Sequence, residues 1–491
     1  MELSQAYSTL FSDMGHTLPM LLTALAGLII VGLDAFKPRH VSIPYITGLV
    51  LFGLMGLELT TIYGETGTAY FDLMRFGGMA GYVNALILGS GALSVVLLKP
   101  YLEDLDNNIG EAYALILFSI TGMLMMGSAN SLVTIFVGLE TMSICLYILT
   151  AIIRSHDGAI ESALKYFLLG AFSTGFFLYG IALIYGATGT MILSDMSGAV
   201  AASENTTMFW VGFSLLLVGY LFKVGAAPFH MWTPDVYQGA PTPITGFMST
   251  ASKTAAFASL ILVLYYAVPT DTWSSVIAVI ALITMVVGNL LAISQRNVKR
   301  MLAYSSIAHA GYVLVGLAAG TDAGYSGALF YMLVYTFMNI GAFGVIAYLE
   351  WDSKEGSEQE LDSLAGIGYK RPVLAWSMVF FMFSLAGFPP LGGFFGKVAV
   401  FGPAIDAGLI WLAVLGVLTS AISAYYYLRV LVVFFMKAPA EDRGLDAKTI
   451  PFAPRAVIVL CAVALIILGV APGIMEVTSS FFGSAATAAL P

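Results

Sequence analysis

The sequence contains little charge. Only 10% of its 491 residues are Asp, Glu, Lys or Arg, whereas soluble proteins usually contain about 25%. Hydrophobic residues make up 59% of the chain, and the mean hydropathy is +0.90. A single soluble core cannot bury so much apolar surface, so the composition excludes an ordinary soluble fold and predicts a polytopic membrane protein.

Cysteine is scarce as well. Cys145 and Cys461 both fall in apolar runs and form no CxxC pair, which excludes a disulfide framework and an iron–sulfur cluster. The run GGFFGKV at 392–398 lacks the first glycine and the final hydroxyl residue of a phosphate loop. We therefore expect no cofactor or metal on this chain. The N-terminal stretch has no basic n-region, so we expect its first apolar run to be a retained helix.

Apolar segments of spanning length are abundant. The predicted spans are 17–36, 41–62, 77–98, 112–128, 131–153, 161–187, 208–228, 243–268, 272–294, 300–319, 324–349, 372–403, 409–436 and 455–482. Fourteen of the twenty Lys and Arg residues lie in alternate loops, whereas the opposite loops and the termini hold only Arg75. By the positive-inside rule, this asymmetry supports fourteen helices with both termini outside.

No segment is long enough to form a separate soluble domain. The longest polar piece, residues 350–371, is acidic and predicts a short solvated surface helix rather than a binding site. We predict a single membrane domain over 1–491, with three N-terminal helices in 1–110, two five-helix repeats in 111–270 and 271–440, and a C-terminal helix in 441–491.

Two interrupted apolar runs suggest the repeats. LFKVGAAPFHMWTPDVYQGAPTP at 221–243 and SLAGFPPLGGFFGK at 384–397 each contain Pro, Gly and one lysine, and they lie five segments apart. Proline breaks a membrane helix, and the freed backbone groups are tolerated only inside protein or beside a wet cavity. We therefore expect the seventh and twelfth helices to be broken beside a charge.

Four charges stand isolated in apolar sequence: Glu140, Lys223, Lys253 and Lys397. Each costs roughly 2.5–3.5 kcal/mol at the bilayer centre on the more lenient scale. A structural ion pair would account for two of them, but not for three lysines with one glutamate. We interpret the set as a proton relay, because a desolvated lysine changes its protonation state readily when a neighbouring charge moves.

Two further residues are candidates for the relay, each with an alternative. Lys165 follows Glu161 by four residues, which fits either a structural pair or a proton-entry element. His309 follows Ser305 and Ser306 by about one turn of an apolar helix, which fits either a packing residue or a relay residue.

The run KVGAAPFHMWTPDVYQGAPTP at 223–243 resembles the subunit N family of respiratory complex I, the proton-pumping NADH:quinone oxidoreductase, whose mitochondrial counterpart is subunit 2. The resemblance continues through STASKTAAFA around Lys253, SLAGFPPLGGFFGK around Lys397 and GLETMSICLYIL around Glu140, and it covers essentially the whole chain. The WTPDVY sequence is the specific part, because the sister subunits and the cation/proton antiporters look like WLPDAH at that place.

The resemblance implies an all-α, antiporter-like fold of fourteen helices with two inverted repeats. It implies a proton-translocating subunit of an enzyme that carries its FMN, iron–sulfur clusters and quinone on other subunits. Its expected functional set is Glu140, Lys165, Lys223, Lys253 and Lys397, to which we add His309.

Expected partners are the other membrane subunits of the complex: a neighbouring antiporter-like subunit, small membrane subunits and the lateral helix of the largest antiporter-like subunit. The expected location is the bacterial inner membrane. A subunit of a cation/proton antiporter and a subunit of a ferredoxin-dependent photosynthetic complex are the alternatives.

Overall fold

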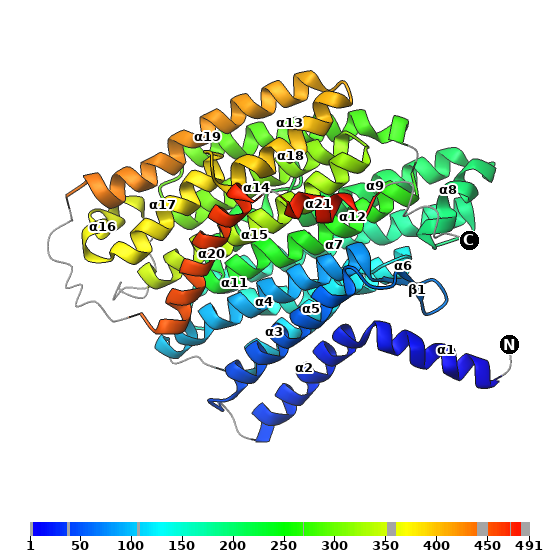
Figure 1. Cartoon of the computed structure of the whole chain (residues 1–491), viewed down its shortest axis with the longest axis horizontal. Coiled ribbons are helices and arrows are strands. Elements are labelled where there is room, and N and C mark those ends of the chain that lie inside the picture. Colours follow the sequence, from blue (N-terminus) through cyan, green and yellow to red (C-terminus); the bar gives the residue numbers. More distant parts are fainter. Residues whose placement is uncertain are drawn as a thin grey trace.

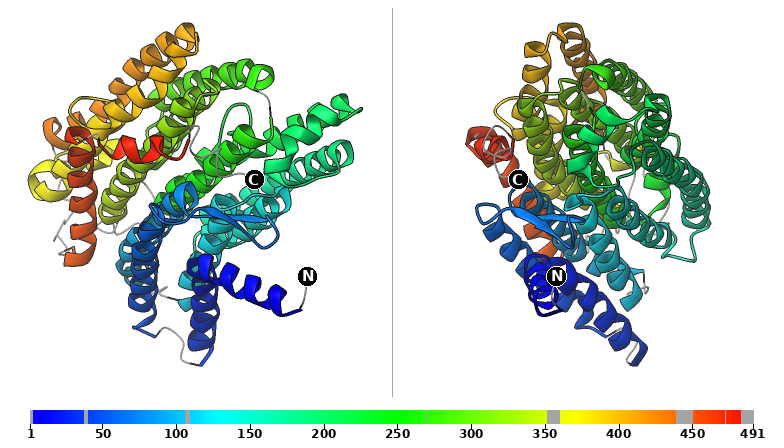
Figure 2. Two further views of the ribbon diagram at one scale, coloured as in Figure 1. Left: turned by 45° about the vertical axis from the view of Figure 1, so that its right-hand side comes forward. Right: turned by 90° about the vertical axis from the view of Figure 1, so that its right-hand side faces the viewer.

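The computed structural model describes residues 3–36, 40–105, 109–268, 270–350, 360–438, 450–471 and 473–482. Long helices dominate the described chain and run side by side through the molecule, as Figures 1 and 2 show. Helices are expected here, because a helix satisfies its backbone hydrogen bonds internally where no water is available.

The elements follow in three groups. The N-terminal group comprises α1 (Leu3–His16), α2 (Leu18–Phe36), α3 (Ile43–Thr61), β1 (Gly67–Ala69), β2 (Met74–Phe76), α4 (Gly78–Asp104), α5 (Gly110–Gly127), α6 (Leu132–Thr150), α7 (Asp157–Thr188) and α8 (Leu193–Ala202). The central group comprises α9 (Thr206–Val224), α10 (Trp232–Gly239), α11 (Thr242–Phe247), the π-helix η1 (Met248–Ser252), α12 (Lys253–Tyr266), α13 (Thr270–Ile293), α14 (Val298–Ala318) and α15 (Asp322–Glu350). The C-terminal group comprises the 3₁₀-helix η2 (Leu361–Leu364), α16 (Ile367–Lys370), α17 (Pro372–Ala386), α18 (Gly392–Asp406), α19 (Ile410–Met436), α20 (Phe452–Val470) and α21 (Ile474–Ser479).

The polytopic all-α architecture is confirmed. Within the described ranges, thirteen helical segments are long and apolar enough to cross a bilayer, with α11, η1 and α12 forming one of them. The predicted span 372–403 is divided between α17 and α18. The last predicted span was too long, because α20 ends at Val470 and the short helix α21 follows separately. A Pro–Gly pair in the sequence at 472–473 explains this early end.

The polar segment 350–371 differs from the single surface helix predicted for it. Residues 351–359 lie outside the described residues, and 360–371 contain η2 and the one-turn helix α16. Lys437, directly after α19, pairs with Asp362 at 2.6 Å. This carboxylate accepts a hydrogen bond from the ammonium group, which together with the positive charge of Lys437 holds the pKa of Asp362 below its ordinary value.

Both predicted helix breaks are present. In the seventh predicted span, α9 ends at Val224 and is capped by Gly225, whose φ is +73°. The next helix, α10, begins at Trp232. The twelfth predicted span is interrupted between α17, which is capped by Gly387 at φ +90°, and α18. The division of the chain into two five-helix repeats stays a prediction. It expects one broken helix in each repeat, and these are the two breaks described above.

The centre of the molecule is formed by α12, α14 and α15, whose spanning segments are almost fully buried. Around them, α13 packs along α14 and α7 packs along α9. The contact between α7 and α9 depends on glycine, because a Cβ on Gly180 would lie 2.6 Å from the carbonyl oxygen of Gly212. Helices α2, α7 and α19 expose many apolar side chains, as expected for surfaces that meet lipid or other membrane proteins.

Candidate functional site

Glu140 lies in α6 and faces α7. The hydroxyl of Thr174 in α7 donates a hydrogen bond of 2.8 Å to Oε1 of Glu140. Thr174 and Lys223 both line a narrow gap between α6, α7 and α9. Glu140 lies within electrostatic range of Lys223 but makes no direct ion pair with it within 4.0 Å. Glu140 and Lys223 are therefore close in space, as predicted, and Thr174 contacts the first and lines the same gap as the second.

Lys223 occupies the last turn of α9, directly before the break. Its side chain is buried, and its Nζ has no hydrogen-bond partner among the described residues. The ammonium lies 5.6 Å from the ring centroid of Tyr147 and 5.7 Å from that of Tyr166, within the range of cation–π attraction. The hydroxyl of Thr233, which lies against Gly225 at the break, is buried and likewise has no described partner. Internal water is the usual partner of such groups.

Lys253 is the first residue of α12 and follows the π-helix η1 directly. Its Nζ donates to the carbonyl oxygen of Ser306 at 2.8 Å and to the Ser306 hydroxyl at 2.6 Å. Tyr335 donates to the same hydroxyl at 2.7 Å. A Cβ on Gly225 would lie 3.9 Å from Nζ of Lys253, so the lysine sits against the break between α9 and α10.

His309 lies on α14, one turn beyond Ser305 and Ser306. Its Nδ1 is 2.7 Å from the hydroxyl of Tyr331 in α15, and its Nε2 is 3.1 Å from the hydroxyl of Tyr427 in α19. Tyr427 also hydrogen-bonds to Ser305. His309 is thus held by hydrogen bonds on both ring nitrogens, and it lies within electrostatic range of both Lys253 and Lys397.

Lys397 projects from α18 into the break that precedes it. Its Nζ donates to the carbonyl oxygens of Leu385 at 3.0 Å and Ala386 at 2.8 Å, and to the hydroxyl of Ser420 at 2.7 Å. The two carbonyls terminate α17 and have no helical partner, because the helix stops at Gly387. The negative end of the α17 dipole also favours a cation there. The proline break therefore creates the acceptors that this buried lysine needs.

The polar series continues beside Lys397. The ammonium lies 5.1 Å from the ring centroid of Tyr312. The amide of Asn289 donates to the Tyr312 hydroxyl at 3.1 Å and accepts from the Tyr426 hydroxyl at 2.9 Å. Polar side chains from α13, α14, α15, α18 and α19 thus meet around His309 and Lys397.

Lys165 is placed differently from the other candidates. Its side chain is 44% exposed, and it pairs with Glu161 at 2.8 Å and with Asp235 of α10 at 2.9 Å. Arg300 of α14 binds the second oxygen of Asp235 at 2.7 Å. The structure therefore joins Lys165 to a partly exposed network of charges, whereas Lys223, Lys253, His309 and Lys397 are buried and Glu140 is partly buried.

Sequence reasoning missed several members of this arrangement. They are Thr174, Tyr331, Ser420 and Tyr427, all polar residues within apolar helices. Their isolation in apolar sequence was a weak signal, since most such residues hydrogen-bond only within their own helix. The π-helix before Lys253 was also not predicted; such distortions often occur at functional sites. Among the described residues, no group of three or more His, Cys, Asp or Glu side chains could hold a metal ion.

Comparison with known proteins gives consistent matches. Residues 129–423 match the family described as NADH:quinone oxidoreductase/Mrp antiporter, TM. The chain is 57% identical over its whole length, and over the whole relative, to a Salinibacter ruber protein named NADH-quinone oxidoreductase subunit N.

Two solved structures share the fold. A chain of respiratory complex I from Thermus thermophilus is 36% identical, with a TM-score of 0.80 over 93% of this chain and 98% of that chain. A chain of the Mrp complex from Dietzia sp. DQ12-45-1b is 21% identical, with a TM-score of 0.83 over 95% of this chain and 96% of that chain, and is similar in fold.

Proposed function

Since the chain belongs to the NADH-quinone oxidoreductase subunit N family, we propose that its buried polar series conducts protons across the membrane when the complex reduces quinone. The proposed order is Glu140, Lys223, Lys253, His309 and Lys397. NADH oxidation and quinone reduction take place on other subunits, which carry the FMN and the iron–sulfur clusters. This chain supplies the movement of protons.

The observation that carries the proposal is the run of titratable groups through the molecule, of which Lys223, Lys253, His309 and Lys397 are buried and Glu140 is partly buried. Thr174 lies between the environments of Glu140 and Lys223. Lys253 contacts Ser306, and His309 lies one turn further along the same helix. From His309, the hydroxyls of Tyr331 and Tyr427 extend the series towards Tyr312 and Lys397. A water molecule at the unpaired hydroxyl of Thr233, which lies against Gly225 as Lys253 does, would bridge Lys223 to Lys253.

Each isolated charge then biases its neighbour. An ionised Glu140 favours the protonated form of Lys223, and withdrawal of that negative charge favours release of the proton towards Lys253. A proton arriving near His309 disfavours a second positive charge on Lys397 and promotes its release to the outer side. The surface network of Lys165, Asp235 and Arg300 fits an entrance on the inner side.

We propose that both termini lie outside a bacterial inner membrane; the asymmetry of the loop charges supports this orientation. Expected neighbours are another antiporter-like subunit, small membrane subunits and the lateral helix of the largest antiporter-like subunit. A role as a cation/proton antiporter subunit is the second candidate, because the Mrp chain shares the fold. The full-length identity of 57% to a subunit N favours the role in the quinone-reducing complex over the antiporter role.

The decisive experiment replaces Lys397 by Met in the assembled complex and measures proton translocation by liposomes during quinone reduction. We expect fewer protons per NADH oxidised. Lys437→Met is the matched control, because this lysine pairs with Asp362 on the surface. If Lys397 served only to attach a neighbouring subunit, the complex that does assemble would pump normally but dissociate in detergent, and the exit-site assignment would be abandoned.

A further inference from the structure

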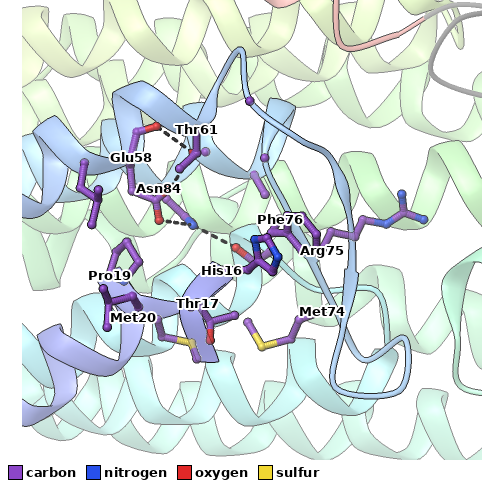
Figure 3. A pocket seen from close by; sticks show the side chains of 18 of the residues that line it. His16, Thr17, Pro19, Met20, Glu58, Thr61, Met74, Arg75, Phe76 and Asn84 are labelled. Carbon is purple, nitrogen blue, oxygen red and sulfur yellow. Dashed lines mark hydrogen bonds between the residues drawn. The ribbon is translucent and has the colours of Figure 1, made fainter. Parts of the chain in front are cut away.

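A second polar site lies in the N-terminal three-helix unit. A cavity of about 340 Å³ is lined by the junction of α1 and α2, the end of α3, the β-hairpin and α4, as Figure 3 shows. At about 30 Å³ per molecule, this volume accommodates roughly ten waters. Helix α4 forms one wall of the cavity and packs on the central α12 and α15, and none of Lys223, Lys253, His309 and Lys397 lines the cavity. The cavity is therefore distinct from the buried series around Lys253.

Glu58 of α3 forms part of the cavity wall. Its side chain is buried, and the residue is only 5% exposed. Asn84 of α4 donates to Oε1 at 3.1 Å. The Thr61 hydroxyl lies 3.0 Å from Oε2 and 2.8 Å from the carbonyl oxygen of Glu58, so these two acceptors share its one hydrogen. The Asn84 amide also donates to the Ser128 hydroxyl at 3.0 Å, so both of its hydrogens are used. Figure 3 shows Glu58, Thr61 and Asn84 grouped at one side of the cavity.

No cation neutralises this carboxylate in the described part of the chain. The ion pairs formed there do not include Glu58. Arg75 lines the cavity, but its guanidinium donates to Asn130 and Tyr266 and points away from Glu58 in Figure 3. His16 is exposed and stacks on Phe76 at 3.8 Å.

Two other carboxylates lie nearby. Glu65 is exposed at the rim of the cavity, and Asp13 accepts a hydrogen bond from the backbone of Tyr70. Glu58 is thus a buried carboxylate that lines a cavity large enough for water and has no positively charged partner among the described residues. A buried carboxylate without a neutralising positive charge is unfavourable unless it takes up a cation or a proton.

We propose that Glu58 binds a small monovalent cation, a proton or a sodium ion, which enters through the cavity from the outer water. The outer location follows from the orientation given in the proposed function; binding itself does not depend on it. A proton would add to one carboxylate oxygen. A sodium ion would use the same oxygens with the Thr61 hydroxyl and water, since hard cations prefer oxygen ligands. This site lies outside the central series and is a second place where the chain holds a cation.

The test uses the purified, assembled complex and a hydrophobic carbodiimide, which modifies protonated carboxyl groups. Peptide mass spectrometry would quantify the modification of Glu58 over a pH series, in sodium chloride and in choline chloride of equal concentration. If the ligand is a proton, modification persists near neutral pH and then falls roughly ten-fold per pH unit in both salts. If it is sodium, the modification falls on addition of sodium at constant pH.

Glu58→Gln and Glu65→Gln are the paired variants. Glutamine keeps the shape and the acceptor oxygen of Glu58 but cannot take up a proton, whereas Glu65 is the exposed carboxylate of the same cavity. Infrared difference spectra between acid and alkaline pH should lose a protonated-carboxyl band in Glu58→Gln and retain it in Glu65→Gln. The sodium form would instead show a carboxylate band that responds to sodium and is absent from Glu58→Gln.

The infrared measurement covers the case in which the carbodiimide cannot reach the cavity. The proposal is overturned if Glu58 is unmodified at every pH and Glu58→Gln leaves the difference spectra unchanged. It is also overturned if modification responds to neither pH nor sodium. These results would leave the relay through Lys253 and Lys397 unaffected, because that proposal depends on proton translocation by other residues.

Discussion

Replacing Gly387 by alanine should displace Lys397 without altering any titratable group. Gly387 caps α17 at φ +90°, a conformation that L-residues other than glycine rarely adopt. An added Cβ would lie 2.9 Å from Nζ of Lys397 and 3.0 Å from its Cδ. The substitution therefore strains the backbone and also pushes the ammonium away from the carbonyls that end α17.

The backbone strain sets the minimum size of the effect. An alanine in a left-handed conformation costs about 1–2 kcal/mol, and this strain destabilises the observed arrangement. The hydrogen bond from Lys397 to Ala386 at 2.8 Å opposes the displacement equally with either residue at 387, so it does not change the ratio. Since 1.36 kcal/mol is a factor of ten, the population with Lys397 in place should fall about 5- to 30-fold.

The assay is proton translocation by purified complex in liposomes, normalised to the rate of quinone reduction, with assembly measured on native gels. Gly402→Ala is the matched control, because Gly402 lies in α18 and an added Cβ there meets no atom within 4 Å. We expect Gly387→Ala to translocate fewer protons and Gly402→Ala to behave like the unmodified complex. Equal proton translocation and equal assembly in the two variants would refute the reasoning.

Two further substitutions test the relay at other points. Thr174→Val removes the donor to Glu140, a loss of about 1.5–3 kcal/mol for a hydrogen bond to a charged group. It should therefore reduce proton translocation, whereas Thr174→Ser keeps the hydroxyl and should restore it; normal pumping by the valine variant would show that this contact is not used. Lys253→Arg should retain part of the pumping, because a guanidinium can still donate to Ser306, and Lys253→Ala should lose it. Full proton translocation by an assembled alanine complex would mark Lys253 as a spectator.

The sequence by itself determined the membrane character, most of the spans and both helix breaks. These properties are local: a run of apolar residues of the right length forms a spanning helix whatever its neighbours are. The breaks at Gly225 and Gly387 are local too, since glycine and proline act on the backbone where they stand. The isolated charges Glu140, Lys223, Lys253 and Lys397 were visible for the same reason. The end of the last span was misplaced because a long apolar stretch obscured its early stop.

Only the tertiary structure decided which groups meet. Thr174 reaches Glu140 from another helix, and Tyr427 reaches His309 across 118 positions of sequence. Such contacts depend on the rotation and depth of each helix, which hydropathy does not specify when a helix is apolar on every side. The same limit explains why the sequence left Lys165 open between a structural pair and a proton-entry element, whereas the structure shows it in a partly exposed network with Glu161 and Asp235. Whether a charged side chain is buried, and so needs a hydrogen-bond or ion-pair partner, depends on packing between segments that are distant in the sequence.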